Sequence, residues 1–183
     1  MIDLALITTC APNVAPETIQ EIIRVESKGN PLAININGGK NNKQPSSKKE
    51  ATAIAQKAIA LGYTVDMGLM QINSNNLKRL GLSVEKMWDP CINIQAGAAI
   101  ITENYIQAKK QHGEGQPALQ AALSAYNTGS FTKGLANGYV NQYYSLRYQP
   151  MSLALNDTKY ITKTKIVKMS NPYISETTIF KRG

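Results

Sequence analysis

The spacing of apolar residues over the first 148 positions predicts a mainly α-helical fold. Ile19, Ile22 and Ile23 lie at helical spacing in a segment that begins at Pro16 and should stop at Gly29. Similar stripes predict further helices over about 47–61, 74–80, 90–111, 117–126 and 130–148.

Strand patterns are scarce in the same part of the chain. No long alternation of polar and apolar residues occurs, so we expect at most a small β-hairpin, near 34–40 or 63–72. The expected fold class is therefore mainly α, in the α+β sense, as one folded domain over residues 10–148. Residues 1–9 lack the basic start of a secretory signal. Three interpretations of this segment stay open: a trimmed signal remnant, a first strand and a short helix.

Composition excludes several classes of protein. Hydrophobic residues make up 43% of the 183 residues and charged residues 17%, which is typical of a globular chain rather than a disordered polyelectrolyte. One histidine and two cysteines argue against a zinc site, and we expect neither a metal nor a cofactor. No apolar run approaches 18 residues, so we expect no transmembrane helix.

Positive charge is concentrated in the last segment, residues 149–183. The whole chain carries 20 basic and 12 acidic residues, a net charge of +8. The segment lacks a helical stripe, and we interpret it as an extended, basic tail. It is either a plain soluble tail or a docking arm for a partner or an anionic polymer.

The two cysteines each stand beside a predicted helix boundary. Cys10 precedes Ala11-Pro12, and Cys91 follows Asp89-Pro90. A bridge between them would close a loop of about 80 residues and contribute roughly 4 kcal/mol in an oxidising compartment. Two buried, reduced thiols are the alternative.

Glu26 is the first candidate for chemistry. It lies three residues after Ile23 and four after Ile22, so it shares their helix face. Burial and the negative end of the helix dipole would both raise its pKa, as a glycosidase acid requires. From periodicity alone, a solvated surface glutamate is the more common outcome.

Four motifs in order change this interpretation. Glu26-Ser27 is followed by Gly68-Leu-Met-Gln-Ile-Asn73, then Ala125-Tyr-Asn-Thr-Gly129, and then Tyr139-Val140. This set resembles the soluble lytic transglycosylases, lysozyme-like enzymes that cut peptidoglycan. The resemblance covers about residues 10–148.

Two further stretches narrow the resemblance. Cys10-Ala-Pro-Asn-Val-Ala-Pro16, and Asp89-Pro-Cys91 with Asn93 and Ala96-Gly-Ala98, are similar to the specialised transglycosylases of type IV secretion and conjugation systems. The resemblance implies local opening of the wall for such an apparatus, in the periplasm or cell envelope.

The resemblance places the catalytic acid at Glu26. It implies that Glu26 protonates the oxygen between N-acetylmuramic acid and N-acetylglucosamine. The substrate's own acetamido group then stabilises the cation, and the ionised Glu26 acts as base on the 6-hydroxyl, which gives a 1,6-anhydromuramoyl product. The matched motifs contain no second carboxylate, unlike those of two-carboxylate hydrolases.

Other motif residues would bind substrate. The resemblance implies that Gln71 offers amide hydrogen bonds, that Met70 forms an apolar wall and that Tyr139 fixes the carboxyl of Glu26. Ser27 orients Glu26, touches substrate or simply closes the helix end. The remaining predicted contacts are Asn73, Tyr126 and Asn127.

One stretch departs from the family pattern. Many relatives carry an acidic residue and an arginine before Tyr-Val, whereas this chain has Leu135-Ala-Asn-Gly138. An extra carboxylate contact to the glycan is therefore in doubt. Asp66 is the nearest other acid to the second motif, and we interpret it as a turn residue.

The positive charge fits an anionic polymer partner such as peptidoglycan. It would also fit nucleic acid, but no nucleic-acid motif is present and the aromatic residues are not interleaved with basic ones. Three alternatives remain. The chain is a hydrolytic muramidase, or it is a peptidoglycan-binding scaffold protein. In the third, which does not exclude catalysis, the tail or a processed fragment binds secretion-channel subunits.

Overall fold

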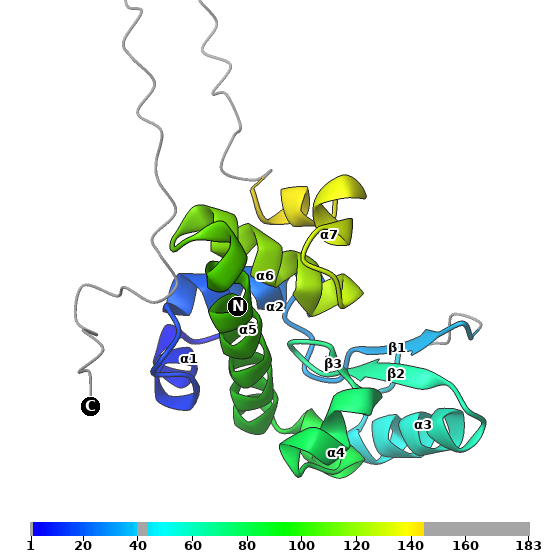
Figure 1. Cartoon of the computed structure of the whole chain (residues 1–183). Helices are drawn as coiled ribbons and strands as arrows, with labels where there is room; N and C mark the ends of the chain where they lie inside the picture. The colour runs from blue at the N-terminus through cyan, green and yellow to red at the C-terminus, as the bar shows by residue number, and fades with distance from the viewer. Residues whose placement is uncertain (1, 40–43, 145–183) are drawn as a thin grey trace, which may run out of the picture.

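The longest helix in the described part of the chain, α5 (Pro90–His112), lies near the centre of the fold, with other helices on one side and, on the other, a small sheet accompanied by further helices (Figure 1). The computed structural model describes residues 2–39 and 44–144. The other elements, in chain order, are α1 (Leu4–Cys10), α2 (Pro16–Ser27), β1 (Ile34–Asn37), α3 (Lys48–Ala60), β2 (Thr64–Met67), β3 (Ile72–Asn73), the 3-10 helix η1 (Ser74–Asn76), α4 (Leu77–Leu80), η2 (Val84–Trp88), α6 (Gln116–Thr128), α7 (Lys133–Ala136) and η3 (Val140–Tyr143). The predicted mainly α fold is confirmed.

Most predicted helices are present with boundaries close to those expected. α2 begins at Pro16, and Lys28 and Gly29 follow it with positive φ angles. The side chain of Ser47 accepts a hydrogen bond from the amide of Glu50 and so caps the start of α3. The short 3-10 helix η2 was not predicted, because five residues give no readable helical period.

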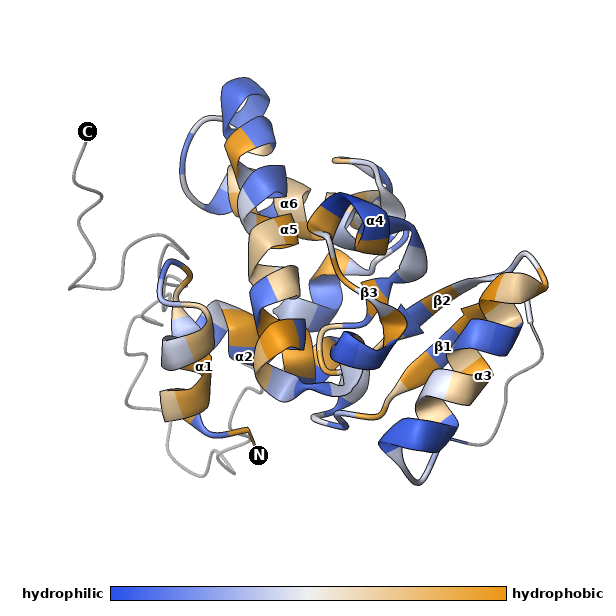
Figure 2. Ribbon diagram, turned by 90° about the horizontal axis from the view of Figure 1, so that it is seen from below, coloured by the Kyte–Doolittle hydropathy of each residue, from blue (hydrophilic) through white to orange (hydrophobic). Residues whose placement is uncertain are grey.

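The sheet is antiparallel with strand order β1-β2-β3. Ile34 pairs with Met67 and Asn35 with Asp66, so the two sites at which a hairpin was expected are strands of one sheet, with α3 between them in sequence. Figure 2 shows α3 along these strands, with hydrophilic and hydrophobic residues around its circumference.

Alternation along the strands gives the sheet two unlike faces. The buried side chains are Ile34, Val65, Met67 and Ile72, which belong to the core that also contains the alanines of α3. The positions between them carry Asn35, Asn37, Asp66 and Asn73. A polar sheet face is thus left free of the core.

The predicted last helix, 130–148, is wrong as one element. The structure has α7 and η3 instead, and Gly138 between them has a φ of +79° that ends helical geometry. The break turns Tyr139 and the residues of η3 back towards α2, where Arg24 donates to the carbonyl oxygen of Gln142 at 2.7 Å.

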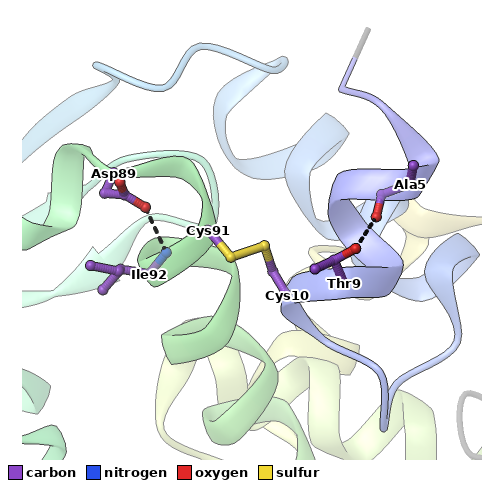
Figure 3. Close-up of a disulfide and its surroundings, with 6 residues drawn as sticks. All are labelled: Ala5, Thr9, Cys10, Asp89, Cys91 and Ile92. Atoms are coloured by element: carbon purple, nitrogen blue, oxygen red, sulfur yellow. Dashed lines mark hydrogen bonds between the residues drawn. A yellow bond between two sulfur atoms is a disulfide. The ribbon is translucent and has the colours of Figure 1, made fainter.

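Cys10 and Cys91 form a disulfide, which is the first of the two alternatives expected from the sequence (Figure 3). Cys10 ends α1 and Cys91 lies in the first turn of α5, with Cα atoms 5.3 Å apart. Asp89 caps α5 by accepting from the amide of Ile92 at 3.0 Å. The first residues therefore form a helix, α1, that is tied covalently to the central helix.

No helix in residues 2–39 and 44–144 is long and apolar enough to cross a membrane. The predicted basic tail, 149–183, lies outside the described residues.

Candidate functional site

A groove of about 1290 Å³ runs between the polar face of the sheet and the ends of α2 and α6. Ten of its 23 lining residues are Asn or Gln, and its charged lining residues are Glu26, Lys28, Asp66 and Arg79. Amide groups both donate and accept hydrogen bonds, so this lining suits a ligand rich in hydroxyl and acetamido groups.

Glu26 lies in the last turn of α2 and lines the groove. Its neighbours Ile22 and Ile23 are buried, so the helix face predicted from their spacing carries the carboxyl to the edge of the core. Burial raises the pKa of Glu26, and the charge of Asp66 raises it further, whereas hydrogen bonds from Tyr139 and Tyr143 lower it. The net result is a raised pKa, as expected from the sequence.

Two tyrosines hold this carboxyl. The hydroxyl of Tyr139 donates to Oε1 of Glu26, which confirms the predicted contact. The hydroxyl of Tyr143 lies 2.6 Å from that of Tyr139 and 3.4 Å from the same Oε1. Tyr143 was missed in the sequence, although its spacing of four residues from Tyr139 places both side chains on one side of a helical turn.

Ser27 closes the helix end. Its hydroxyl donates to the carbonyl oxygen of Ile23 at 3.1 Å and accepts from the amide of Gly29 at 3.2 Å. Of the three expected roles, the structure shows this one, and Ser27 also borders the groove.

Gln71 is fixed by its own amide group. The residue adopts a φ of +48°, and its Nε2 donates to the carbonyl oxygens of Ala33 and Gly68 at 3.0 and 2.9 Å. Because two acceptors face Nε2, the orientation of the amide is determined and Oε1 is the atom left for a ligand. Its contact with substrate remains a prediction.

Met70 does not form the predicted apolar wall. Its side chain is fully buried, and its sulfur occupies the space over Gly97, where a Cβ would lie 2.4 Å from it. Its carbonyl oxygen instead accepts a hydrogen bond from the hydroxyl of Tyr126 at 2.8 Å. The absence of a side chain at Gly97 on α5 thus leaves the space in which the Met70 side chain packs.

Tyr126 and Asn127 line the groove from the last turn of α6. Burial raises the pKa of the Tyr126 hydroxyl well above its usual value, with Glu26 as the next cause. Since this hydroxyl donates inward to Met70, the lone pairs and the ring edge are what remain for a ligand. Asn127 is exposed.

Asp66 was interpreted as a turn residue, which is wrong. It is part of β2 and lines the groove. Its Oδ2 accepts from Nδ2 of Asn35 at 3.1 Å and of Asn37 at 2.8 Å, and its Oδ1 accepts from Nδ2 of Asn73 at 2.6 Å. The strand register brings this second carboxylate into the groove. β2 has only four residues, so its alternation of polar and apolar positions was too short to be recognised in the sequence.

The turn before Gln71 is held by a buried amide. Asn93 on α5 accepts from the amide of Met70 at 2.8 Å and donates to the carbonyl oxygens of Met67 and Met87 at 2.9 and 3.0 Å. Gly68 has a φ of +75°, and a Cβ there would lie 2.3 Å from Nδ2 of Asn93. The central helix therefore sets the position of the motif.

Comparison with known proteins points to one family. Residues 3–146 match the family model described as the transglycosylase SLT domain. The type IV secretion system protein virB1 of Brucella abortus is 42% identical over 132 residues, which are 72% of this chain and 56% of that protein. Protein virB1 of Agrobacterium fabrum is 38% identical over 133 residues, which are 73% of this chain and 54% of that protein.

The chain therefore spans about half the length of the curated relatives it matches. No solved structure matches it significantly.

Proposed function

The chain belongs to the transglycosylase SLT domain family, and we propose that it is a peptidoglycan lytic transglycosylase with Glu26 as its catalytic residue. The observation that carries this proposal is a half-buried carboxyl of raised pKa, held by two tyrosines at the side of an amide-lined groove. A carboxyl whose pKa is raised keeps its proton to higher pH than an exposed glutamate, and it can give that proton to a leaving oxygen.

In the first step, protonated Glu26 donates to the oxygen between N-acetylmuramic acid and N-acetylglucosamine. The bond between that oxygen and the anomeric carbon breaks, and the substrate's acetamido group stabilises the resulting cation. Oε1 of Glu26 faces the tyrosines, so Oε2 is the oxygen free to carry the proton into the groove.

In the second step, the ionised Glu26 takes the proton of the muramoyl 6-hydroxyl. The hydroxyl oxygen then bonds to the anomeric carbon, and the product is a 1,6-anhydromuramoyl end. No water is consumed, and Glu26 is protonated again for the next cycle. The hydrogen bond from Tyr139 supports the ionised form between the two steps.

Amides on opposite sides of the groove would orient the glycan. Oε1 of Gln71 suits the N–H of an acetamido group, and Asn127, on the opposite wall, is free to donate to a sugar hydroxyl. Nδ2 of Asn73 donates one hydrogen bond to Oδ1 of Asp66, so Asn73 would act by fixing that carboxylate.

The names of the relatives suggest the setting. Two virB1 proteins, one of them named as a type IV secretion system protein, align with most of this chain. We place this chain in the periplasm or cell envelope, where it would open the wall locally for a secretion or conjugation apparatus. The Cys10–Cys91 disulfide supports an oxidising compartment.

Contact with channel subunits through the basic residues 149–183 is part of the same proposal.

A hydrolytic muramidase is the second candidate, and Asp66 favours it. Hydrolases of this chemistry use a second carboxylate beside the acid, and Asp66 is a carboxylate in the same groove, held by three amide donors. In that reaction water attacks the anomeric carbon and the product has a reducing end.

Release of soluble muropeptides from purified peptidoglycan tests the proposal. The wild type should release them and Glu26→Gln should not, because the amide keeps the shape but has no acidic proton. Asp66→Asn separates the candidates: it should leave anhydro ends dominant in a transglycosylase and abolish reducing ends in a hydrolase. No release by any variant, with peptidoglycan bound, would instead support a scaffold protein.

A further inference from the structure

Tyr143 is a buried titratable side chain that the two reaction steps above do not use. It is 3% exposed and lies in η3, one turn after Tyr139. Its ring meets that of Tyr139 edge to face, with centroids 5.5 Å apart and an interplanar angle of 70°. Burial raises the pKa of its hydroxyl, with the charge of Glu26 as the next cause, so the hydroxyl keeps its proton.

Proton counting fixes the direction of the hydrogen bonds. The hydroxyl of Tyr139 has one proton, and it donates that proton to Oε1 of Glu26. In the 2.6 Å contact between the two hydroxyls, Tyr139 can therefore only accept, and Tyr143 donates. Tyr143 also has a single proton, and its contact with Oε1 of Glu26 at 3.4 Å is the longer and weaker of its two. The result is a chain from Tyr143 through Tyr139 to Glu26, in which each bond polarises the next.

This chain of hydrogen bonds is also connected to α2, the helix that carries Glu26. Arg24, two residues before Glu26 on α2, donates to the carbonyl oxygen of Gln142, next to Tyr143 in η3. One end of α2 thus carries both Glu26 and Arg24, and both side chains contact the segment that holds the two tyrosines. These contacts connect η3 to the end of α2.

We infer that Tyr143 is a positioning residue for the Glu26 carboxyl and that it acts through the hydroxyl of Tyr139. The inference rests on the proposed function, in which Glu26 donates its proton in the first step and, as a carboxylate, takes a proton from the 6-hydroxyl in the second. The hydroxyl of Tyr143, which donates to Tyr139, strengthens the hydrogen bond that Tyr139 donates to the carboxylate of Glu26. It thereby favours the ionised form against burial.

Other ionisable groups face the same carboxyl and stay unchanged in the test. Asp66 on β2 acts on Glu26 through its charge, and Tyr126 on α6 is influenced by Glu26 in turn. Lys28 lines the groove two residues after Glu26 and is exposed. Their contributions are common to wild type and variant, so they cancel in the difference.

Tyr143→Phe removes only the hydroxyl, and Tyr144→Phe is its matched control. Tyr144 is the next residue, and its hydroxyl bonds Oε1 of Gln116 rather than Glu26. We measure kcat/KM for muropeptide release against pH. Loss of the Tyr143 donor should raise the pKa of Glu26 and move the alkaline limb up by about half a pH unit, whereas the control should follow the wild type.

An alkaline limb that does not move in Tyr143→Phe overturns the inference, whether or not the rate falls, because a packing defect lowers the rate without moving the limb. The double variant Tyr139→Phe/Tyr143→Phe tests the route. It should match Tyr139→Phe alone, and a further shift equal to that of Tyr143→Phe would show that Tyr143 acts independently.

Carbon-13 NMR titration of the Glu26 carboxyl gives the same comparison without substrate. The carboxyl should titrate at higher pH in Tyr143→Phe than in wild type and Tyr144→Phe, and an unchanged titration would overturn the inference. This readout needs no cleavage, so it tests the inference by itself. Failure of the proposed function would be seen separately, as the absence of products from the wild type.

Discussion

The hydroxyl of Tyr139 donates a hydrogen bond to Oε1 of Glu26, although 113 positions separate the two residues in sequence. The contact joins the last turn of α2 to the residue just before η3. It places a donor on Oε1, while Glu26 itself lines the groove. The proposed catalysis depends on this arrangement.

Tyr139→Phe should lower the cleavage rate and move its alkaline limb to higher pH. Removing the donor leaves burial as the dominant influence on Glu26 and raises the pKa of its carboxyl further. We expect about a tenfold loss of kcat/KM near neutral pH, measured as muropeptide release. Tyr63→Phe, on an exposed tyrosine, is the control; equal rates for the two variants would contradict the role of Tyr139.

Glu26→Gln should be more stable than the wild type at pH 7. Burial raises the pKa of Glu26 above its ordinary value of 4.5, so between the two values the native state holds more proton than the unfolded chain. The free energy of unfolding of the wild type therefore falls as pH rises through that window, and an uncharged Gln escapes the loss.

Thermal melting at pH 4 and pH 7 measures this. The variant should have the higher midpoint at pH 7, and the difference should disappear at pH 4. A lower midpoint at pH 7 would mean that the charged carboxylate is stabilised in the native state.

The sequence predicted the elements that have a full helical period. Helical spacing placed Glu26 on the face of Ile22 and Ile23, but the four motifs of the family resemblance, not the spacing, singled it out as the catalytic residue. It could not give the break at Gly138, because an apolar stripe continues through a single glycine. Met70 was misplaced for a different reason: whether it faces the groove depends on Gly97, a contact between elements. Asp66 depends likewise on strand register rather than on local pattern.

Asn93→Ala should destabilise the protein and reduce activity together. Asn93 is fully buried and bonds three backbone groups, one of them the amide of Met70 beside Gln71. Leaving these groups without partners should cost about 3 kcal/mol. Urea denaturation measures the loss.

Asn104→Ala on the same helix is the control, because Asn104 makes one hydrogen bond of 3.4 Å. It should cost less than about 1 kcal/mol. Equal losses in the two variants would argue against a special role for Asn93 in holding the turn.

Cys10→Ser/Cys91→Ser should lower the free energy of unfolding by about 2–5 kcal/mol. The bridge spans a sequence separation of 81, so its absence lets the unfolded chain expand. Denaturation of this variant should match that of the reduced wild type, with Thr9→Ser as a neighbouring control. A variant as stable as the oxidised wild type would show that α1 is held by packing alone.

Mass spectrometry of the products from purified peptidoglycan tests the central claim most directly, with wild type and Glu26→Gln side by side. The account predicts 1,6-anhydromuramoyl ends from the wild type and no products from the variant. Products heavier by one water, each with a reducing end, or anhydro products from Glu26→Gln at the wild-type rate, would contradict it.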